Sequence, residues 1–183
     1  SLKMLGGGSG MIGQVVNWLL GRPGRDLIYS KKKYRDFELS LEWKISANGN
    51  SGIFYFVADE DETYPWLTGL EMQVLDNDGH PDGKIHKHRA GDLSDLIAAE
   101  PETVRPVGQW NEVLIRVKDH RVEHWLNGTM VVSYLHGDSQ WDAMVAASKF
   151  DDMPRFGMSD SGYIVLQDHG DPVWYRNIRV RTL

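Results

Sequence analysis

The chain has 183 residues, 41% of them hydrophobic and 25% charged, which is enough for one domain with a substantial apolar core. Acidic residues outnumber basic ones by 26 to 20, a balance that argues against binding to nucleic-acid phosphates. The absence of cysteine excludes disulfides and thiolate chemistry, and the longest apolar run near the start, residues 15–20, is too short to span a membrane.

The N-terminal segment, residues 1–25, is rich in glycine, and we expect it to form a loose arm or an irregular first strand. From residue 26 onward the pattern changes to short runs of alternating apolar and polar residues, separated by turn residues. Neither an internal repeat nor a linker is visible in residues 26–183. The sequence therefore predicts a glycine-rich arm followed by a single domain.

Strand signals dominate the first half of this domain. Apolar and polar residues alternate strictly over residues 37–45, a period of two that is typical of a strand with one face in the core. The turn signal Asn48-Gly49-Asn50 precedes a second strand at residues 51–57, and a further strand is predicted at residues 69–75. Residues 93–99 are predicted to form a short helical turn.

The clearest local signal is an antiparallel meander of three strands. Asp119-His120 joins a strand at residues 113–118 to a strand at residues 121–126. Asn127-Gly128 then fits a type I′ turn, in which both central residues need positive φ, and leads into a strand at residues 129–135.

The end of the chain adds one short helix and two more strands. Ser139 is predicted to cap a helix that runs to Ala147, and strands are predicted at residues 164–167 and 173–181. Many short strands with few helices indicate an all-β fold. We expect a lectin-like jelly-roll β-sandwich with antiparallel sheets, and an eight-strand barrel is the competing architecture.

A candidate binding surface lies on the strand at residues 69–75. Leu70, Met72 and Val74 share one face of this strand, whereas Glu71 and Gln73 share the other. Such a face is either solvated or part of a binding groove. The polar loop that follows favours the groove.

That loop, residues 76–91, concentrates acidic and imidazole side chains. Candidate ligands for a divalent metal are Asp76, His80 and His86, and His86 and His88 share one side of an extended segment. Their spacing matches no specific metal motif, so the alternative is a solvated acidic loop. This candidate metal ion is the one cofactor that the sequence suggests.

A second polar corner follows the predicted strand at residues 164–167. His169 shares parity with Gln167, so both side chains would line the groove, whereas Asp168 faces the other way. Histidine is the side chain best suited to proton exchange near neutral pH.

Two familiar hydrolytic machineries do not fit the sequence. Glycosidases with paired carboxylates, such as the sandwich glucanases, would need an acidic residue where Gln73 stands. Serine hydrolysis is disfavoured because no Gly-x-Ser-x-Gly segment is present. The seven Trp and seven Tyr residues supply either core packing or flat faces for sugar rings.

From about Asp26 to Leu183 the chain resembles the 3-keto-disaccharide hydrolases. The motifs that carry this resemblance are Asp36-Phe37-Glu38-Leu39, Asn50-Ser51-Gly52-Ile53-Phe54, Glu71-Met72-Gln73-Val74-Leu75-Asp76, Trp110-Asn111-Glu112-Val113, Val122-Glu123-His124-Trp125-Leu126-Asn127-Gly128, Ser148-Lys149-Phe150, Leu166-Gln167-Asp168-His169-Gly170 and Arg176-Asn177-Ile178. The chain departs from the family at Phe56, where Arg is common and would contact a sugar or an anion, and at Ser94, where Tyr is frequent.

The resemblance implies a concanavalin A-like sandwich, a carbohydrate partner and a periplasmic or extracellular bacterial location, although no complete signal peptide is visible. It also implies cleavage of a glycoside that is oxidised at C3, with His88 or His169 as the base. Lys149 or a metal ion would stabilise the enolate. The predicted catalytic residues are His88, His169, Glu71 and Lys149, and the predicted sugar-binding residues are Gln73, Tyr55, Trp66, Trp125, Gln167 and Asp168. A non-catalytic carbohydrate-binding module is the main alternative, followed by an interaction domain.

Overall fold

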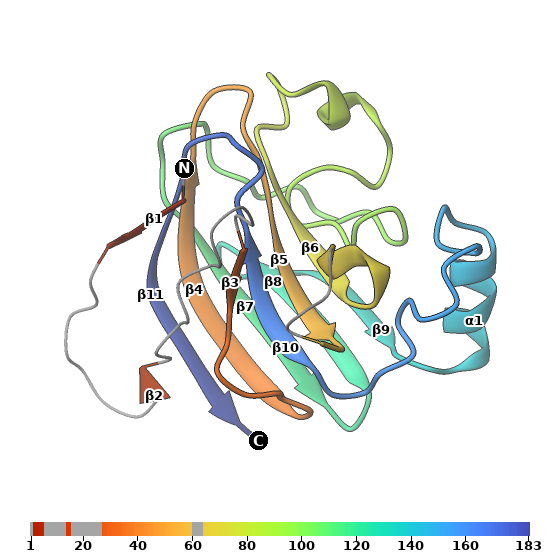
Figure 1. Cartoon of the computed structure of the whole chain (residues 1–183). Helices are drawn as coiled ribbons and strands as arrows, with labels where there is room; N and C mark the ends of the chain where they lie inside the picture. The colour runs from red at the N-terminus through yellow and green to blue at the C-terminus, as the bar shows by residue number, and fades with distance from the viewer. Residues whose placement is uncertain (1, 6–13, 16–26, 60–63) are drawn as a thin grey trace.

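Two β-sheets pack face to face in the computed structural model, which describes residues 2–5, 14–15, 27–59 and 64–183, with residues 2–5, 14–15 and 27–29 as backbone alone (Figure 1). Within these residues, the larger sheet has the order β1 (Leu2–Leu5), β11 (Val173–Thr182), β4 (Phe37–Ile45), β7 (Asn111–Lys118), β8 (Arg121–Leu126) and β9 (Thr129–Leu135), and β2 (Gln14–Val15) also pairs with β11. The smaller sheet has the order β3 (Leu27–Tyr29), β10 (Tyr163–Gln167), β5 (Asn50–Val57) and β6 (Leu70–Leu75). The prediction of an all-β sandwich is confirmed.

The core lies between the two sheets. Residues of β4 alternate between buried and half-buried along the whole strand, as the sequence pattern predicts. Strand β5 differs, because all of its residues are buried. Its inner face meets the larger sheet, and on its outer face Phe54 and Val57 pack with Val165, Trp66 and Tyr163. Strand β5 is therefore buried on both of its faces.

The predicted meander is confirmed in detail. Strand β7 pairs with β8, and β8 pairs with β9, all antiparallel. The turn residues have the positive φ that tight hairpins require, 48° and 64° at Asp119 and His120, and 52° and 82° at Asn127 and Gly128.

Two local predictions were wrong. The helix α1 (Ser139–Ala146) is capped by Asp138 and not by Ser139, because the Asp138 carboxylate accepts a hydrogen bond from the backbone N–H of Trp141 at 2.7 Å. The predicted helical turn at residues 93–99 is not helical, because Leu93 forms β-bridges with Met72 and Ile97. This segment lies along the free edge of β6. The short 3₁₀ turns η1 (Pro65–Leu67) and η2 (Pro81–Lys84) flank that strand.

A bulge in β5 turns Phe56 toward the core, beside Tyr55. The pairing of β10 with β5 shifts register between Tyr163 and Val165, and Phe56 has a φ of 58°. Tyr55 and Phe56 are consequently both buried in the core between the sheets, where the Phe56 ring lies 5.3 Å from that of His136. Position 56 therefore faces the core and does not offer a contact to sugar.

The predicted N-terminal arm is described only in part. Strands β1 and β2 pair with β11, and the rest of residues 1–25 lies outside the described residues. No helix in the described part of the chain is long and apolar enough to cross a membrane.

Candidate functional site

Glu71 lies on the outer face of the smaller sheet, over a glycine of the neighbouring strand. It pairs with Phe54 across β5 and β6. A Cβ atom placed on Gly52 would lie 2.2 Å from Oε1 of Glu71 and 2.8 Å from Cε2 of Phe54. The carboxylate therefore occupies space that only glycine leaves open, beside an aromatic ring.

This environment changes the acidity of Glu71. Burial raises the pKa of the Glu71 carboxyl to about 7, while a hydrogen bond with Ser94 and the charge of Lys149 lower it and the charge of Asp82 raises it. A carboxyl group with this pKa is present in both protonation states near neutral pH. It is suited to give or take a proton.

Gln73, on the same face of β6 as Glu71, is held by hydrogen bonds to neighbouring protein groups. Its side chain is only 5% exposed. Its Nε2 donates hydrogen bonds to Oδ1 of Asn50 at 2.9 Å and to the carbonyl of Ser51 at 3.1 Å, and its Oε1 accepts one from Ser94 at 3.4 Å. Because both ends of the amide bind protein groups, the structure gives Gln73 a supporting position and not a free face for sugar hydroxyls.

The predicted polar corner at residues 167–171 lies beside β5, the neighbour of β6. The Ser51 hydroxyl donates to the carbonyl of Gln167 at 2.6 Å, and Asp171 accepts a hydrogen bond from the backbone N–H of Asn50 at 3.1 Å. Asp168 Oδ1 accepts a hydrogen bond from the N–H of Gly170, and His169 is exposed.

The loop after β6 returns to the strand and supplies an imidazole–carboxylate pair. Backbone hydrogen bonds join Gln73 to Gly91 and Asp92, and the N–H of Ser94 to the carbonyl of Glu71, all at 2.9 to 3.0 Å. Immediately after Ser94, Asp95 Oδ1 lies 2.9 Å from Nε2 of His88. The loop thus carries His88 and Asp95 to the edge of the sheet beside Glu71.

Asp95 is also held from a third segment. Its Oδ2 accepts a hydrogen bond from the backbone N–H of Lys149, which follows α1. Burial tends to raise the pKa of Asp95, but hydrogen bonds with His88 and Lys149 outweigh it and lower the pKa below its usual value. An ionised Asp95 orients the imidazole, while the exposed Lys149 ammonium contributes positive charge near Glu71.

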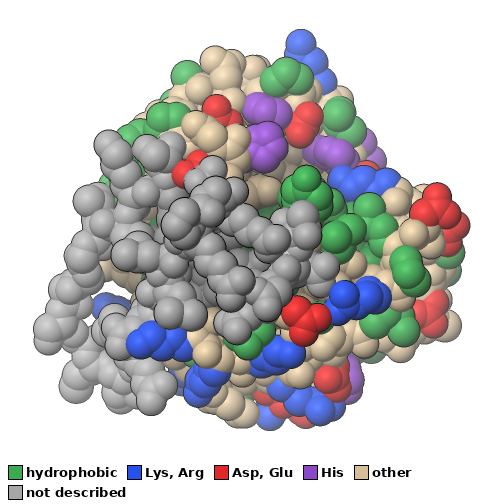
Figure 2. All heavy atoms as spheres, viewed as in Figure 1, with side chains coloured by type: hydrophobic (Ala, Val, Ile, Leu, Met, Phe, Trp, Pro, Cys, Tyr) green, Lys and Arg blue, Asp and Glu red, His purple; other side chains and the backbone are tan. Residues whose placement is uncertain are grey.

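The predicted metal ligands do not come together. Asp76 accepts hydrogen bonds from the backbone N–H groups of Asn48, Asp78 and Gly79, and His80 accepts one from the N–H of Asp82. His86 is exposed. Histidine side chains gather along the upper rim of the face in Figure 2, but within the described residues no three His, Asp or Glu side chains converge in a way that would hold a metal ion.

An aromatic surface adjoins the carboxylate. Trp66 packs against Phe54 and Val165, and the ring of Tyr64 stacks on it with centroids 4.4 Å apart and planes inclined by 19°. Tyr64 is 49% exposed. Sequence reasoning identified Trp66 but missed Tyr64, although their spacing of two is a signal for side chains that lie together.

Two predicted sugar-binding residues lie elsewhere. Tyr55 is buried between the sheets, where its hydroxyl binds His124 and Tyr134. Trp125 lies on the outer face of the larger sheet, where its indole N–H donates to Glu123 at 3.0 Å. Strand parity places each side chain on a face, but it does not tell which face belongs to the site.

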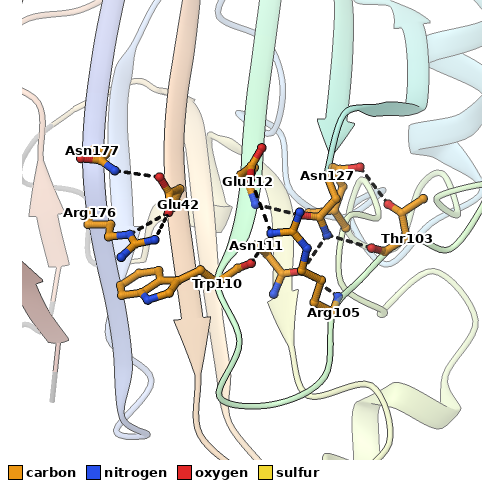
Figure 3. A network of polar contacts seen from close by, with 10 residues as sticks. Glu42, Thr103, Arg105, Trp110, Asn111, Glu112, Asn127, Arg176 and Asn177 are labelled. Atoms are coloured by element: carbon orange, nitrogen blue, oxygen red, sulfur yellow. Dashed lines mark hydrogen bonds and ion pairs between the residues drawn. The ribbon is translucent and has the colours of Figure 1, made fainter. Parts of the chain in front are cut away.

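The outer face of the larger sheet carries a polar network of its own (Figure 3). Glu42 accepts hydrogen bonds from Nε of Arg176 and Nδ2 of Asn177, both at 2.7 Å, and the Arg176 guanidinium lies 3.9 Å from the centroid of the Trp110 ring. Burial tends to raise the pKa of Glu42, but the hydrogen bonds from Asn177 and Arg176 outweigh it and lower the pKa. This carboxylate is paired and stays ionised.

Comparison with known proteins supplies independent findings. The family model of the 3-keto-alpha-glucoside-1,2-lyase-like domain matches residues 10–181. A 3-keto-disaccharide hydrolase of Bacteroides thetaiotaomicron is 40% identical over 182 residues, which cover 87% of this chain and 62% of that protein. The chain thus spans about three fifths of the length of this curated relative.

Solved structures agree with this fold. A candidate glycosyl hydrolase of Parabacteroides distasonis ATCC 8503 superposes with a TM-score of 0.80 at 32% identity, covering 87% of this chain and 75% of that one. The carbohydrate-binding module CBM66 of Bacillus subtilis shares the fold alone, with a TM-score of 0.56 at 15% identity over 98% of this chain and 100% of that one.

Proposed function

The chain belongs to the 3-keto-alpha-glucoside-1,2-lyase-like domain family, and from this premise we propose that it cleaves glycosides whose sugar carries a ketone at C3. The observation that carries the proposal is the meeting of three kinds of group at one edge of the smaller sheet. They are a carboxyl with a pKa of about 7, an imidazole–carboxylate pair and a lysine.

The chemistry needs few groups. A ketone at C3 acidifies the proton on C2, so a base can remove that proton and leave an enolate. The enolate re-forms the ketone, creates a double bond between C1 and C2 and expels the C1 oxygen, which takes up a proton. Addition of water to this double bond gives the free 3-keto-sugar and completes a net hydrolysis.

Each of these tasks has a candidate residue. His88, oriented by the ionised Asp95, is the base for the C2 proton. Glu71, protonated in part at neutral pH, is the donor to the departing oxygen. Lys149 supplies positive charge for the enolate, and His169 is the second candidate base.

The aromatic surface provides the binding energy for the sugar. The stacked rings of Tyr64 and Trp66 present a flat apolar surface next to Phe54 and Glu71. Such surfaces suit the C–H faces of pyranose rings. The proposed partner is therefore a 3-keto-glycoside, and a periplasmic or extracellular location accords with this family.

The test compares a 3-keto-glucoside with its unoxidised parent. We expect release of the aglycone from the oxidised sugar alone. The variants Glu71→Gln and His88→Ala should each lower kcat by about 10²–10⁴-fold, whereas Glu42→Gln on the other sheet should leave it within about twofold of wild type, since no reacting group is lost. Binding of the oxidised sugar without any turnover would contradict catalysis and favour a binding module.

A further inference from the structure

A chain of three buried polar side chains crosses the core of the sandwich. The hydroxyl of Tyr55 lies 2.8 Å from the hydroxyl of Tyr134 and 2.9 Å from Nε2 of His124. His124 is 0% exposed, and apolar side chains of both sheets surround the three groups. A buried polar group that lacks a hydrogen bond lowers the stability of the fold. The three side chains therefore have strong reason to keep this hydrogen-bonded arrangement.

The chain of hydrogen bonds ends on the loop that forms the edge of the candidate site. Nδ1 of His124 lies 3.2 Å from the carbonyl oxygen of Gly91. The N–H of Gly91 in turn donates to the carbonyl of Gln73, which is the first of the backbone hydrogen bonds that tie the loop to β6. Four residues later the same loop delivers Asp95 to His88.

The direction of these hydrogen bonds follows from their acceptor. The Gly91 carbonyl can only accept, so Nδ1 of His124 carries the proton and Nε2 accepts from the Tyr55 hydroxyl. The Tyr55 oxygen then accepts from Tyr134. Removal of the Tyr55 hydroxyl takes away one of the two hydrogen bonds that orient the imidazole toward Gly91.

We propose that His124 and Tyr55 are positioning residues, which fix Gly91 and thereby hold the side chains of Ser94 and Asp95 against Glu71 and His88. This inference rests on the proposed function of that site. None of the residues in the hydrogen-bond chain touches the outer face of the smaller sheet, so they act through the loop and not on the substrate.

The variant Tyr55→Phe tests the inference because it keeps the ring and removes only the hydroxyl. We expect kcat on a 3-keto-glucoside to fall about tenfold with little change in KM, as misplacement of catalytic groups predicts. Tyr134→Phe removes the outer end of the same chain and should have a smaller effect in the same direction. Val117→Ala, in the core near Asp36 and His120 at another end of the sandwich, is the control for lost stability.

A titration of Glu71 in the substrate-free protein separates positioning from general destabilisation. The chemical shift of the Glu71 carboxyl carbon is followed by ¹³C NMR as the pH is varied. The groups that influence its pKa besides burial are Ser94, Lys149 and Asp82. Loss of the Ser94 hydrogen bond should move the midpoint upward in Tyr55→Phe and Tyr134→Phe and leave it in place in Val117→Ala.

An unchanged midpoint in both tyrosine variants, or an equal drop of kcat in Val117→Ala, would overturn the inference. If Tyr55→Phe fails to fold, Tyr134→Phe decides alone. If the wild type cleaves no 3-keto-sugar, the proposed function fails, while the titration still shows whether the tyrosines position the loop.

Discussion

Each sheet of the sandwich carries a carboxylate on its outer face next to aromatic rings, yet the two are held in opposite ways. Glu42 on the larger sheet is bound by Arg176 and Asn177, and its pKa is lowered. Glu71 on the smaller sheet is desolvated over Gly52, and its pKa is raised to about 7.

Hydrogen-bond partners and burial distinguish a structural carboxylate from a reactive one. A carboxylate that accepts hydrogen bonds from an arginine and an amide, as Glu42 does, stays ionised at neutral pH. A carboxylate with burial as its main influence, and with a lysine ammonium near it, keeps the proton available. Glu42 and Glu71 are both glutamates on the outer face of a strand. Their hydrogen-bond partners and their burial determine which of them can exchange a proton near neutral pH.

The largest difference between the two carboxylates is expected when each is exchanged for its amide in turn. Glu71→Gln should abolish most turnover of a 3-keto-glucoside, a loss of about 10²–10⁴-fold in kcat, and Glu42→Gln should not. Steady-state kinetics on both purified variants make the check. Equal losses in the two variants would show that the faces do not differ in function.

A smaller loss is expected from a change that leaves Glu71 in place but fills the space beneath it. The methyl group of Gly52→Ala would lie 2.2 Å from Oε1 of Glu71, so the carboxylate must move. We expect kcat to fall by about 10²-fold, since a shift of about 1 Å has effects of that size. A crystal structure of the variant would show whether Glu71 has moved, and full activity with a displaced carboxylate would refute its role.

The third prediction concerns stability and pH. The pKa of Glu71 rises from 4.5 to about 7 on folding, so its contribution is fully present below pH 4.5 and is lost as the pH rises through 7. Glu71→Gln should therefore gain stability over wild type by about 2–3 kcal/mol more at pH 8 than at pH 5. Urea unfolding at the two pH values measures the difference. A constant difference would mean that the Glu71 pKa is not raised.

The smallest effect is expected at the aromatic surface. Tyr64→Ala removes an exposed ring that stacks on Trp66 and should raise KM for a 3-keto-glucoside a few-fold, by about 0.5–1.5 kcal/mol of binding, with kcat nearly unchanged. Met158→Ala, which alters another exposed apolar side chain, is the matched control. A KM equal to that of wild type in Tyr64→Ala would remove this surface from the site.

The strands could be predicted because their sequence signals depend only on neighbouring residues. Alternation at residues 37–45 and the turn at Asn127-Gly128 depend on neighbours in sequence, and both agree with β4 and with the β8–β9 hairpin. The shared face of Glu71 and Gln73 follows from the same rule.

Contacts between segments that are distant in the sequence could not be predicted from such local signals. Asp95 reaches His88 only because the loop pairs with β6, and Gly52 matters only because it lies under Glu71. Tyr55 was predicted to bind sugar, but its hydroxyl lies in the core, because the sequence alone does not say which face of β5 meets the larger sheet.

The fate of the C2 proton distinguishes elimination from other routes of glycoside cleavage. A 3-keto-glucoside labelled with deuterium at C2 is cleaved by the wild-type protein in ordinary water, and the product is analysed by NMR. Removal of the C2 proton by a base predicts a slower reaction of the labelled sugar and loss of deuterium from the product to solvent. Complete retention of deuterium at C2, at the rate of the unlabelled sugar, would rule out removal of the C2 proton.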